Sequence, residues 1–363
     1  DHRDLHSFPT RRSSDLMKVL ITGGTGFIGS HTVVSLQEQG FEVVIVDNLS
    51  NSDSAVLNRI AKITGKESYF YCEDICNRDA LKNIFSEHQD IVAVIHFAAF
   101  KAVGESVEQP LKYYHNNITG LVSLLEEMKS ARIPNIIFSS SATVYGQPEN
   151  LPATEDSPVL PATSPYGNTK QINEQILRDF LLVNQDLKGI SLRYFNPIGA
   201  HPGGLIGELP IGTPNNLMPF ITQTAIGKHA ELKVFGNDYN TPDGTAIRDY
   251  IHVVDLAEAH VVAMNALLNN SLKENYSVFN LGTGNGFSVL EVIQSFEKTT
   301  GVKLPYRIVE RRPGDVEQIY ASTKLANEVL GWKAKYSLDD MTLSAWNWEK
   351  RLSEQHFSYD DKV

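Results

Sequence analysis

A glycine-rich segment near the start of the chain constrains its fold more than any other feature. Gly23, Gly26 and Gly29 follow a short apolar run at residues 19–22 and lead into an amphipathic stretch at residues 27–39. Glycines at this spacing between a strand and a helix allow a tight turn, a close approach of a pyrophosphate to the backbone, and close packing of the helix on the strand. The segment therefore predicts a dinucleotide-binding unit with phosphates at the N-terminus of the helix.

Apolar runs and helical patterns alternate through the N-terminal half of the chain. Further strands are predicted at residues 42–47, 69–72, 91–96 and 136–139, and helices notably at residues 117–128 and 166–182. Strands that alternate with helices form a parallel sheet covered on both faces, and ligands bind at the carboxyl ends of its strands. The chain is therefore expected to be an α/β protein with a Rossmann-type doubly wound parallel sheet.

The pattern changes after Arg193. Gly, Pro and Asn become frequent between residues 196 and 219, and only residues 251–268 (a predicted helix) and 278–281 (a predicted short strand) remain regular. A chain of 363 residues is long enough for two domains. We expect an NAD-binding Rossmann domain over residues 17–195. A smaller, mainly substrate-binding lobe is expected over residues 196–363, with some elements returning to the first domain.

The first sixteen residues do not fit this plan. Residues 1–16 carry charges, serines and a proline without apolar periodicity, and they lack the hydrophobic region of a signal peptide. Met17 directly precedes the first predicted strand. We interpret residues 1–16 as a non-native or disordered extension and Met17 as the natural start.

Charge and cysteine content narrow the class of protein. The formal net charge of −11 disfavours a nucleic-acid partner, and no apolar run reaches membrane-spanning length. The two cysteines, Cys72 and Cys76, do not have the spacing of a zinc site and have no further cysteine to pair with. They are interpreted as free thiols of a reducing compartment, the cytoplasm, and no metal site is expected.

Tyr166 and Lys170 are the candidate catalytic residues. They lie one turn apart on a predicted helix, so both side chains project from the same face. A lysine in this position is expected to lower the pKa of the phenol, and a phenolate beside a nicotinamide is a base for alcohol oxidation. The spacing alone is not specific, because Tyr320 and Lys324 repeat it. We interpret that second pair as incidental, since no serine-bearing strand precedes it.

Acidic and hydroxyl side chains end the other predicted strands. Asp47 ends the second strand, where a carboxylate accepts hydrogen bonds from ribose hydroxyls and repels a 2′-phosphate, which favours NAD over NADP. Asp74 ends the third strand and is either a contact for the adenine or a helix N-cap. The serines at residues 139–141 follow the fifth strand, where a hydroxyl either relays a proton or caps a turn.

On these residues and several further motifs, the chain from Met17 onward resembles the extended short-chain dehydrogenase/reductase superfamily and, within it, the UDP-glucose 4-epimerase family. The motifs are His96-Phe97-Ala98-Ala99, Lys101–Ser106 in the form Lys-Ala-Val-Gly-Glu-Ser, Ser139 to Gly146, Ser164-Pro165-Tyr166-Gly167, Leu192 to Pro197, Pro214 to Pro219, Phe235 to Tyr239, Arg248 to Val253 and Arg311 to Asp315. The resemblance implies NAD-dependent interconversion of UDP-glucose and UDP-galactose, as part of galactose metabolism, by oxidation at C4′, rotation of the 4-keto sugar and return of the hydride.

The resemblance also implies residue roles. Tyr166 is the base, Lys170 its electrostatic partner and a ribose ligand, and Ser141 the hydroxyl relay that contacts the substrate. The tightly bound NAD is surrounded by Phe27, Ile28, Asp47, Asn48, Asp74, Ile75, Phe97, Ala98, Lys101 and Asn116. The UDP-sugar is held by Asn196, Asn215, Leu217, Lys233, Phe235, Arg248, Arg312 and Asp315.

Alternatives within and beyond the family remain open at this point. Sugar-nucleotide 4,6-dehydratases resemble Thr-Asp-Glu where this chain has Ser141-Ala142-Thr143, so the carboxyl pair for elimination is missing. Ile319 stands where a bulky tyrosine restricts N-acetylated sugars in some epimerases, which leaves UDP-GlcNAc as an alternative substrate. A non-catalytic NAD-sensing regulator is a further alternative. The resemblance also implies a homodimer formed through the helices at residues 117–128 and 166–182.

Overall fold

The computed structural model describes residues 17–312 and 315–354. The extension predicted at residues 1–16, and the proline and glycine of the Arg311-to-Asp315 motif, lie outside these residues. Within the described part of the chain, no helix is long and apolar enough to cross a membrane.

A seven-stranded sheet forms the centre of the N-terminal half, in the order β10-β6-β5-β4-β1-β2-β3, with every neighbouring pair parallel. Its strands are β1 (Lys18–Thr22), β2 (Glu42–Val46), β3 (Tyr69–Tyr71), β4 (Ile91–His96), β5 (Asn135–Ser141), β6 (Lys188–Tyr194) and β10 (Tyr276–Leu281). The order reverses between β1 and β4, which is where a doubly wound sheet binds its ligand. The predicted α/β, Rossmann-type fold is confirmed.

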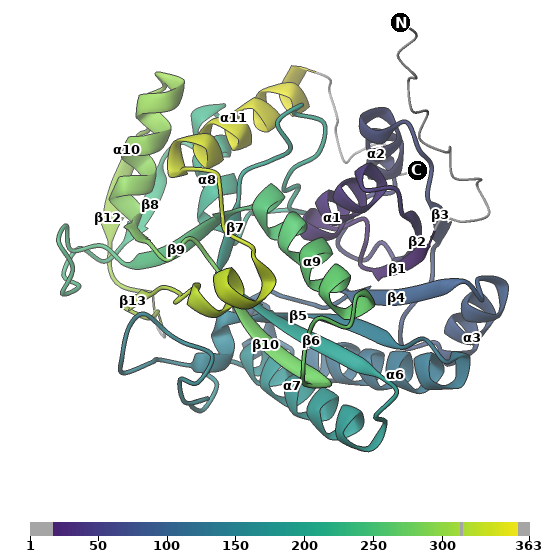
Figure 1. The fold of residues 1–363 in the computed structure, drawn as a ribbon. Helices are drawn as coiled ribbons and strands as arrows, with labels where there is room; N and C mark the ends of the chain where they lie inside the picture. The colour runs from purple at the N-terminus through teal and green to yellow at the C-terminus, as the bar shows by residue number, and fades with distance from the viewer. Residues whose placement is uncertain (1–16, 313–314, 355–363) are drawn as a thin grey trace, which may run out of the picture.

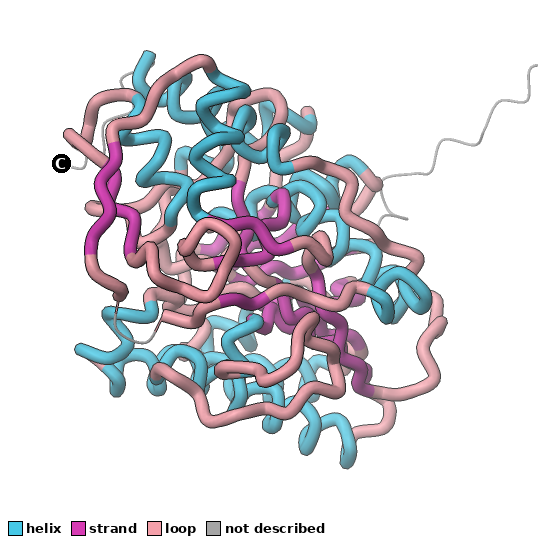
Figure 2. Tube along the Cα trace, turned by 90° about the vertical axis from the view of Figure 1, so that its left-hand side faces the viewer, coloured by secondary structure: helices cyan, strands magenta, loops and turns pink. Residues whose placement is uncertain are grey.

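Helices cover both faces of this sheet (Figure 1). One face carries α1 (Phe27–Glu38), α2 (Ala55–Thr64) and α9 (Val253–Leu268), and the other carries α3 (Arg78–Glu87), α6 (Gly120–Ala131) and α7 (Pro165–Val183). Because side chains alternate along a strand, Val19 and Ile21 of β1 pack toward α1 and α9, whereas Leu20 packs toward α3, α6 and α7. Figure 2 shows the strands running through the middle of the molecule between these helical layers.

Shorter elements connect the layers. Between β4 and α6 lie α4 (Val103–Glu108), α5 (Pro110–Tyr114) and a π-helical segment, η2 (His115–Thr119), and a 3₁₀ turn, η3 (Ala142–Tyr145), directly follows β5. A second π-helical segment, η4 (Ala326–Leu330), precedes the last helix.

The C-terminal half builds two small sheets around a separate apolar core. In the first, β9 (Ile247–His252) pairs with β7 (Asn196–Ile198), β11 (Gly286–Ser288) and β13 (Gln318–Ile319); in the second, β8 (Leu232–Phe235) pairs with β12 (Tyr306–Val309). The helices α8 (Leu217–Ala225), α10 (Val289–Thr300) and α11 (Leu338–Glu354) enclose this core. Two elements of this half, α9 and β10, instead join the seven-stranded sheet and its covering helices.

The structure differs from the prediction in several elements, and three of them bear on the site. Strand β6 is missing from the prediction; its segment is Lys-Gly-Ile-Ser-Leu-Arg-Tyr, with a single β-branched residue. The helix predicted at residues 251–268 begins at Val253, because Ile251 and His252 pair with β7 and the His252 ring accepts the capping hydrogen bond from Val254 N–H. The helix predicted at residues 117–128 begins regularly only at Gly120, because residues 115–119 are π-helical.

Candidate active site

The glycine loop after β1 leaves no room for side chains. Gly23 has a φ of +72°, and a Cβ there would lie 2.7 Å from the Ala98 nitrogen. A Cβ on Gly29 would lie 2.1 Å from the Gly23 carbonyl oxygen. Helix α1 begins after Gly26 with neither a side-chain cap nor an acidic residue in its first turn. The N–H groups of that turn are therefore suited to an anion, and the loop fits the pyrophosphate of a dinucleotide.

Asp47 is buried at the carboxyl end of β2 and is firmly oriented. One carboxylate oxygen accepts the Thr25 N–H at 3.1 Å, and the other accepts the Leu49 N–H at 3.0 Å and the Ser52 hydroxyl at 3.1 Å. The carboxylate thus joins the second strand to the glycine loop, in the position expected for a ribose ligand.

Asp74 contacts Asn48, the residue after Asp47, and does not cap a helix. Its carboxylate accepts the Cys76 N–H at 2.8 Å and the Asn48 amide at 3.3 Å. Asn77 caps α3 instead, through a hydrogen bond from the Ala80 N–H. The helix-cap alternative for Asp74 is therefore wrong, and its contact with the adenine stays a prediction.

The segment after β4 closes the other side of the loop. The N–H groups of Phe97 and Ala98 both donate to Thr22, to its carbonyl at 3.0 Å and to its hydroxyl at 3.3 Å. The Asn116 amide donates to Asn117 at 3.0 Å, and Ile75 packs against Gly120. Lys101 differs from these residues, because it is exposed and pairs with Glu208 at 3.4 Å.

The predicted catalytic residues meet at the carboxyl end of β5. Helix α7 starts at Pro165, capped by the Ser164 hydroxyl, so Tyr166 lies in its first turn. The Tyr166 hydroxyl is hydrogen-bonded to Ser141. Lys170 lies one turn further along, donates to the Ser139 carbonyl at 2.7 Å, and has its nitrogen 5.9 Å from the centre of the Tyr166 ring.

Burial dominates the electrostatics of this group. It raises the pKa of Tyr166 above its ordinary value, and the hydrogen bond with Ser141 only partly opposes it. Burial also lowers the pKa of Lys170 to about 8, against the opposing charge of Glu174. In the chain without a cofactor the net shift of the Tyr166 pKa is therefore upward, and the lowering by Lys170 stays a prediction.

The predicted substrate residues fall into two groups. Arg248 donates to Asp315 at 2.9 Å, and the Arg312 guanidinium lies 4.5 Å from the centre of the Phe235 ring. In the described residues, the side chains of Asn196, Asn215 and Lys233 are exposed and make no hydrogen bond. Leu217 begins α8 and is half-buried.

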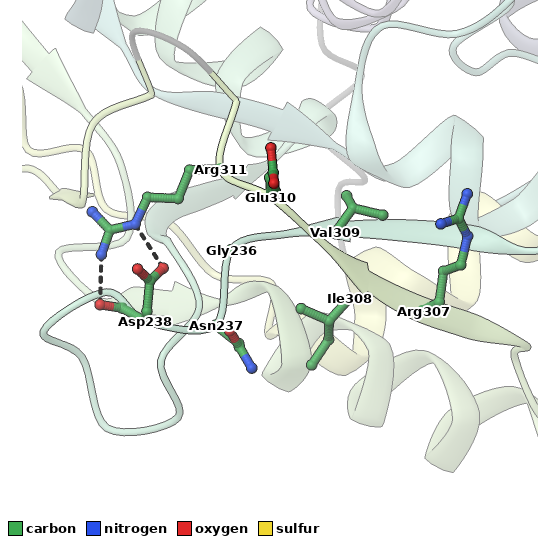
Figure 3. A pocket seen from close by; sticks show the side chains of 8 residues that line it. All are labelled: Gly236, Asn237, Asp238, Arg307, Ile308, Val309, Glu310 and Arg311. Carbon is green, nitrogen blue, oxygen red and sulfur yellow. Dashed lines mark hydrogen bonds and ion pairs between the residues drawn. The ribbon is translucent and has the colours of Figure 1, made fainter.

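An open hollow lies at the edge formed by β8 and β12, lined by the residues next in sequence to Phe235 and Arg312 (Figure 3). It has a volume of about 700 Å³ and is lined by Gly236, Asn237, Asp238, Arg307, Ile308, Val309, Glu310 and Arg311. Arg311 donates to the Asp238 carboxylate at 2.7 Å and lies 4.0 Å from the centre of the Tyr239 ring. The hollow therefore borders the nucleotide-binding candidates and not the Tyr166 group.

Comparison with known proteins identifies the family of this chain. Residues 20–344 match the protein family described as GDP-mannose 4,6 dehydratase. A UDP-glucose 4-epimerase of Yersinia enterocolitica is 56% identical over 334 residues, which are 92% of this chain and 98% of that protein. This chain belongs to the UDP-glucose 4-epimerase family.

Further relatives and solved structures of this family agree. A UDP-glucose 4-epimerase of Bacillus subtilis is 54% identical over 92% of this chain and 97% of its own length. The crystal structure of a Stenotrophomonas maltophila UDP-glucose 4-epimerase, with bound NAD and formylated UDP-arabinopyranose, superposes with a TM-score of 0.90 at 50% identity, covering 93% of this chain and 99% of that one. A Bifidobacterium longum UDP-glucose 4-epimerase in complex with NAD⁺ and UDP gives a TM-score of 0.88 at 48% identity, covering 92% and 98%.

Ala142 and Ile319, at the two positions that bear on the alternative activities, lie in one small apolar cluster. Ser141 is followed by Ala142, which is buried in a small apolar cluster, so no carboxyl pair stands at this strand end. Ile319 belongs to the same cluster and lies opposite Arg248 in the pairing of β13 with β9.

The sequence analysis missed two buried residues behind the catalytic group, Glu174 and Arg193. They form an ion pair with an N–O distance of 2.6 Å. A signal for Glu174 was present, because Tyr166, Lys170 and Glu174 follow one another at four-residue intervals on one helix face. The signal for Arg193 was weaker, since its strand was not predicted.

Proposed function

We propose that this protein interconverts UDP-glucose and UDP-galactose with a tightly bound NAD, using Tyr166, Ser141 and Lys170 as its catalytic residues. The observation that carries the proposal is the Tyr166–Ser141 hydrogen bond at the carboxyl end of β5, at the same edge of the parallel sheet as the glycine loop after β1. A bound NAD supplies the hydride acceptor and donor, and its positively charged ring favours the ionised form of Tyr166.

In this mechanism the chain moves one proton. Tyr166, as phenolate, accepts the proton of the 4′-hydroxyl, either directly or through the Ser141 hydroxyl, and returns it to the opposite face after the keto sugar has turned. Ser141 is fitted to a relay because its oxygen already accepts the Thr143 N–H at 3.2 Å, which fixes the hydroxyl at the end of β5. Lys170, held by the Ser139 carbonyl, keeps a positive charge close to the phenol.

The sugar can turn only if the nucleotide is held and the hexose is not. Arg248 and Arg312 are the candidates for holding the diphosphate, because guanidinium groups bind phosphate through paired, charge-assisted hydrogen bonds. Asn196, Asn215, Leu217, Lys233, Phe235 and Asp315 are proposed to complete the nucleotide site.

One assay tests the proposed activity. Purified protein, incubated with UDP-galactose and no added cofactor, is expected to form UDP-glucose, and denatured protein is expected to release NAD. A 4-keto-6-deoxy product would instead indicate a dehydratase, and release of NAD without any turnover would indicate a regulator. Parallel incubation with UDP-GlcNAc tests whether Ile319 admits an N-acetyl group.

Replacement of Arg248 by methionine is expected to weaken substrate binding more than it slows the reaction. The change replaces the arginine by an unbranched apolar side chain and removes a largely buried cation that pairs with Asp315 at 2.9 Å. Loss of a charge-assisted contact costs about 1.5–3 kcal/mol, so KM for UDP-galactose should rise roughly 10- to 100-fold. Steady-state kinetics check this, and an unchanged KM would remove Arg248 from the substrate site.

A homodimer through α6 and α7 is a further part of the proposal. Both helices carry large apolar side chains that are exposed in the single chain, namely Val122 on α6 and Leu182 and Val183 at the end of α7, the last two 70% and 77% exposed. Exposed apolar side chains on two helices of one face are typical of an interface. A cytoplasmic location is proposed on the two free thiols, Cys72 and Cys76.

The dimer is tested by charging this surface. Val122→Glu combined with Leu182→Glu is expected to convert a dimer into a monomer in sedimentation velocity, because burying two carboxylates without partners is unfavourable. Leu343→Glu on α11 is the control, since Leu343 is 40% exposed in the other half of the chain. A native protein that sediments as a monomer, or a double variant that stays dimeric, would contradict this interface.

A further inference from the structure

A buried ion pair stands behind the proposed catalytic residues and has no part in the proton transfer described above. Arg193 of β6 donates to both carboxylate oxygens of Glu174 on α7, from Nε at 2.9 Å and from Nη2 at 2.6 Å. The two side chains are only 4% and 6% exposed. Removing two charges from water is costly, and such a pair is often replaceable by apolar residues without loss of stability. Its presence here therefore points to a role other than stability.

The pair is attached, through Ser140, to the same segment of β5 that holds the catalytic group. On β5, the Ser139 carbonyl accepts Lys170 Nζ at 2.7 Å, and the Ser140 hydroxyl donates to Glu174 Oε1 at 2.5 Å. The next residue is Ser141, which is hydrogen-bonded to Tyr166. Consecutive residues of one strand thus fix Lys170, Glu174 and Tyr166, which follow one another along one face of α7.

Arg193 extends the same arrangement to the segment after Ser141. Its Nη1 donates to the Tyr145 hydroxyl at 3.0 Å, and that hydroxyl donates to the Asn280 side chain on β10 at 2.6 Å. Tyr145 ends the 3₁₀ turn that begins directly after Ser141. The position of Ser141 is therefore determined from both sides, by Glu174 through Ser140 and by Arg193 through Tyr145.

We propose that Glu174 and Arg193 are positioning residues for the reaction, which orient the serines of β5 and provide the negative charge that keeps Lys170 protonated while Tyr166 ionises. This proposal rests on the catalytic roles proposed above for Tyr166 and Lys170.

The charges around Lys170 support the second part of this role. His96 on β4 faces Lys170, and burial lowers the pKa of that imidazole to about 3, so it is neutral at physiological pH. Tyr194 on β6 lies near Tyr166, and Tyr276 on β10 lies near Glu174. Both are neutral phenols, because burial raises the pKa of each. Among the described residues, Glu174 is the carboxylate whose charge raises the pKa of Lys170 against burial.

Arg193 affects the protonation of Lys170 indirectly, by holding the Glu174 carboxylate in place. Its guanidinium is engaged by the Glu174 carboxylate, the Tyr145 hydroxyl and the Glu155 carbonyl. Loss of the Glu174 charge leaves Lys170 with burial alone, so the ammonium releases its proton at a lower pH. The cation beside Tyr166 is then lost at a pH where the native enzyme still has it.

The test is the pH dependence of turnover in the holoenzyme, with Glu174→Gln as the variant. The native profile is expected to fall as the pH rises through the pKa of Lys170, about 8. In the variant this alkaline limb should move to lower pH by roughly one unit, which is the scale of a single close charge. The ionisation of Tyr166 is followed independently by ultraviolet difference absorbance against Tyr166→Phe, and should require a higher pH in the variant. KM for UDP-galactose should stay within about twofold.

Two controls separate positioning from folding. Glu127→Gln breaks a similar arginine–glutamate contact on α6, where Arg78 Nε and Nη2 donate to Glu127 at 3.0 and 2.7 Å, and it should leave the limb unchanged. Glu174→Leu combined with Arg193→Met replaces the pair by apolar residues and avoids an unpaired buried cation. This double variant should fold and still show the displaced limb, whereas Glu174→Asp should restore the native limb in part.

The outcomes are distinguishable. A native alkaline limb and a native phenolate titration in both Glu174→Gln and the double variant would overturn the proposal, whatever their effect on thermal stability. If Tyr166→Phe itself turns over normally, the catalytic assignment fails first. If Tyr166→Phe is inactive while the Glu174 variants titrate as the native enzyme does, only the positioning role fails.

Discussion

A Tyr166→Phe variant is expected to lose turnover by about 10²- to 10⁴-fold, the contribution that a positioned acid–base group makes. The substitution removes one oxygen atom, the one that is hydrogen-bonded to Ser141 and lies on the ring beside Lys170. The fold should be retained, since a single hydrogen bond contributes about 1 kcal/mol net. The measurement is kcat with UDP-galactose, together with the amount of NAD released on denaturation, which should match that of the native protein.

Tyr276→Phe is the matched control for this experiment. The Tyr276 hydroxyl also pairs with a strand-borne serine, Ser191 on β6, at 2.7 Å, but Tyr276 is the first residue of the edge strand β10, at the end of the sheet opposite to the glycine loop. Its removal should leave kcat within about twofold while costing a similar hydrogen bond. Equal turnover in the two variants would show that Tyr166 is an ordinary buried tyrosine.

The fold was largely predictable because the signals for it are local. The strand–glycine–helix unit and the alternation of apolar runs with helical patterns depend only on neighbouring residues. The elements that were predicted wrongly depend on contacts with residues far away in the sequence. His252 caps α9 although histidine is not a usual capping residue, because pairing of β9 with β7 carries the strand up to it. The π-helical residues 115–119 follow from Asn117, whose amide is drawn to Phe100 and Thr169.

The candidate site was predictable in its members but not in its electrostatics. Residue types and their order identified Tyr166, Lys170 and Ser141, and the structure brings these three together. The sequence could not show that burial raises the pKa of Tyr166, because desolvation depends on packing by residues far apart in the chain. For the same reason the ion pair between Glu174 and Arg193 could not be predicted from the sequence.

Gly29→Ala is expected to yield a protein without NAD and without activity. The added methyl group would lie 2.1 Å from the Gly23 carbonyl oxygen and 2.9 Å from the Gly24 Cα, both of which are backbone atoms that cannot rotate away. Helix α1 must then move away from β1, which costs about 1–3 kcal/mol as overpacking and displaces the N–H groups of its first turn. The measurements are the molar ratio of NAD to purified protein and the rate of UDP-galactose conversion.

Two further glycine substitutions distinguish two causes of NAD loss. Either the added methyl group blocks the NAD site directly, or it disturbs the fold. Gly104→Ala on α4 introduces a methyl group with nothing within 4 Å, and should retain NAD and the native melting temperature. Gly26→Ala is the more informative, because its methyl group meets only the Gly23 oxygen, at 3.3 Å, and otherwise projects into open space. If that space holds the pyrophosphate, Gly26→Ala should fold normally and still lose NAD. A Gly26→Ala protein with a full complement of NAD would place the dinucleotide elsewhere.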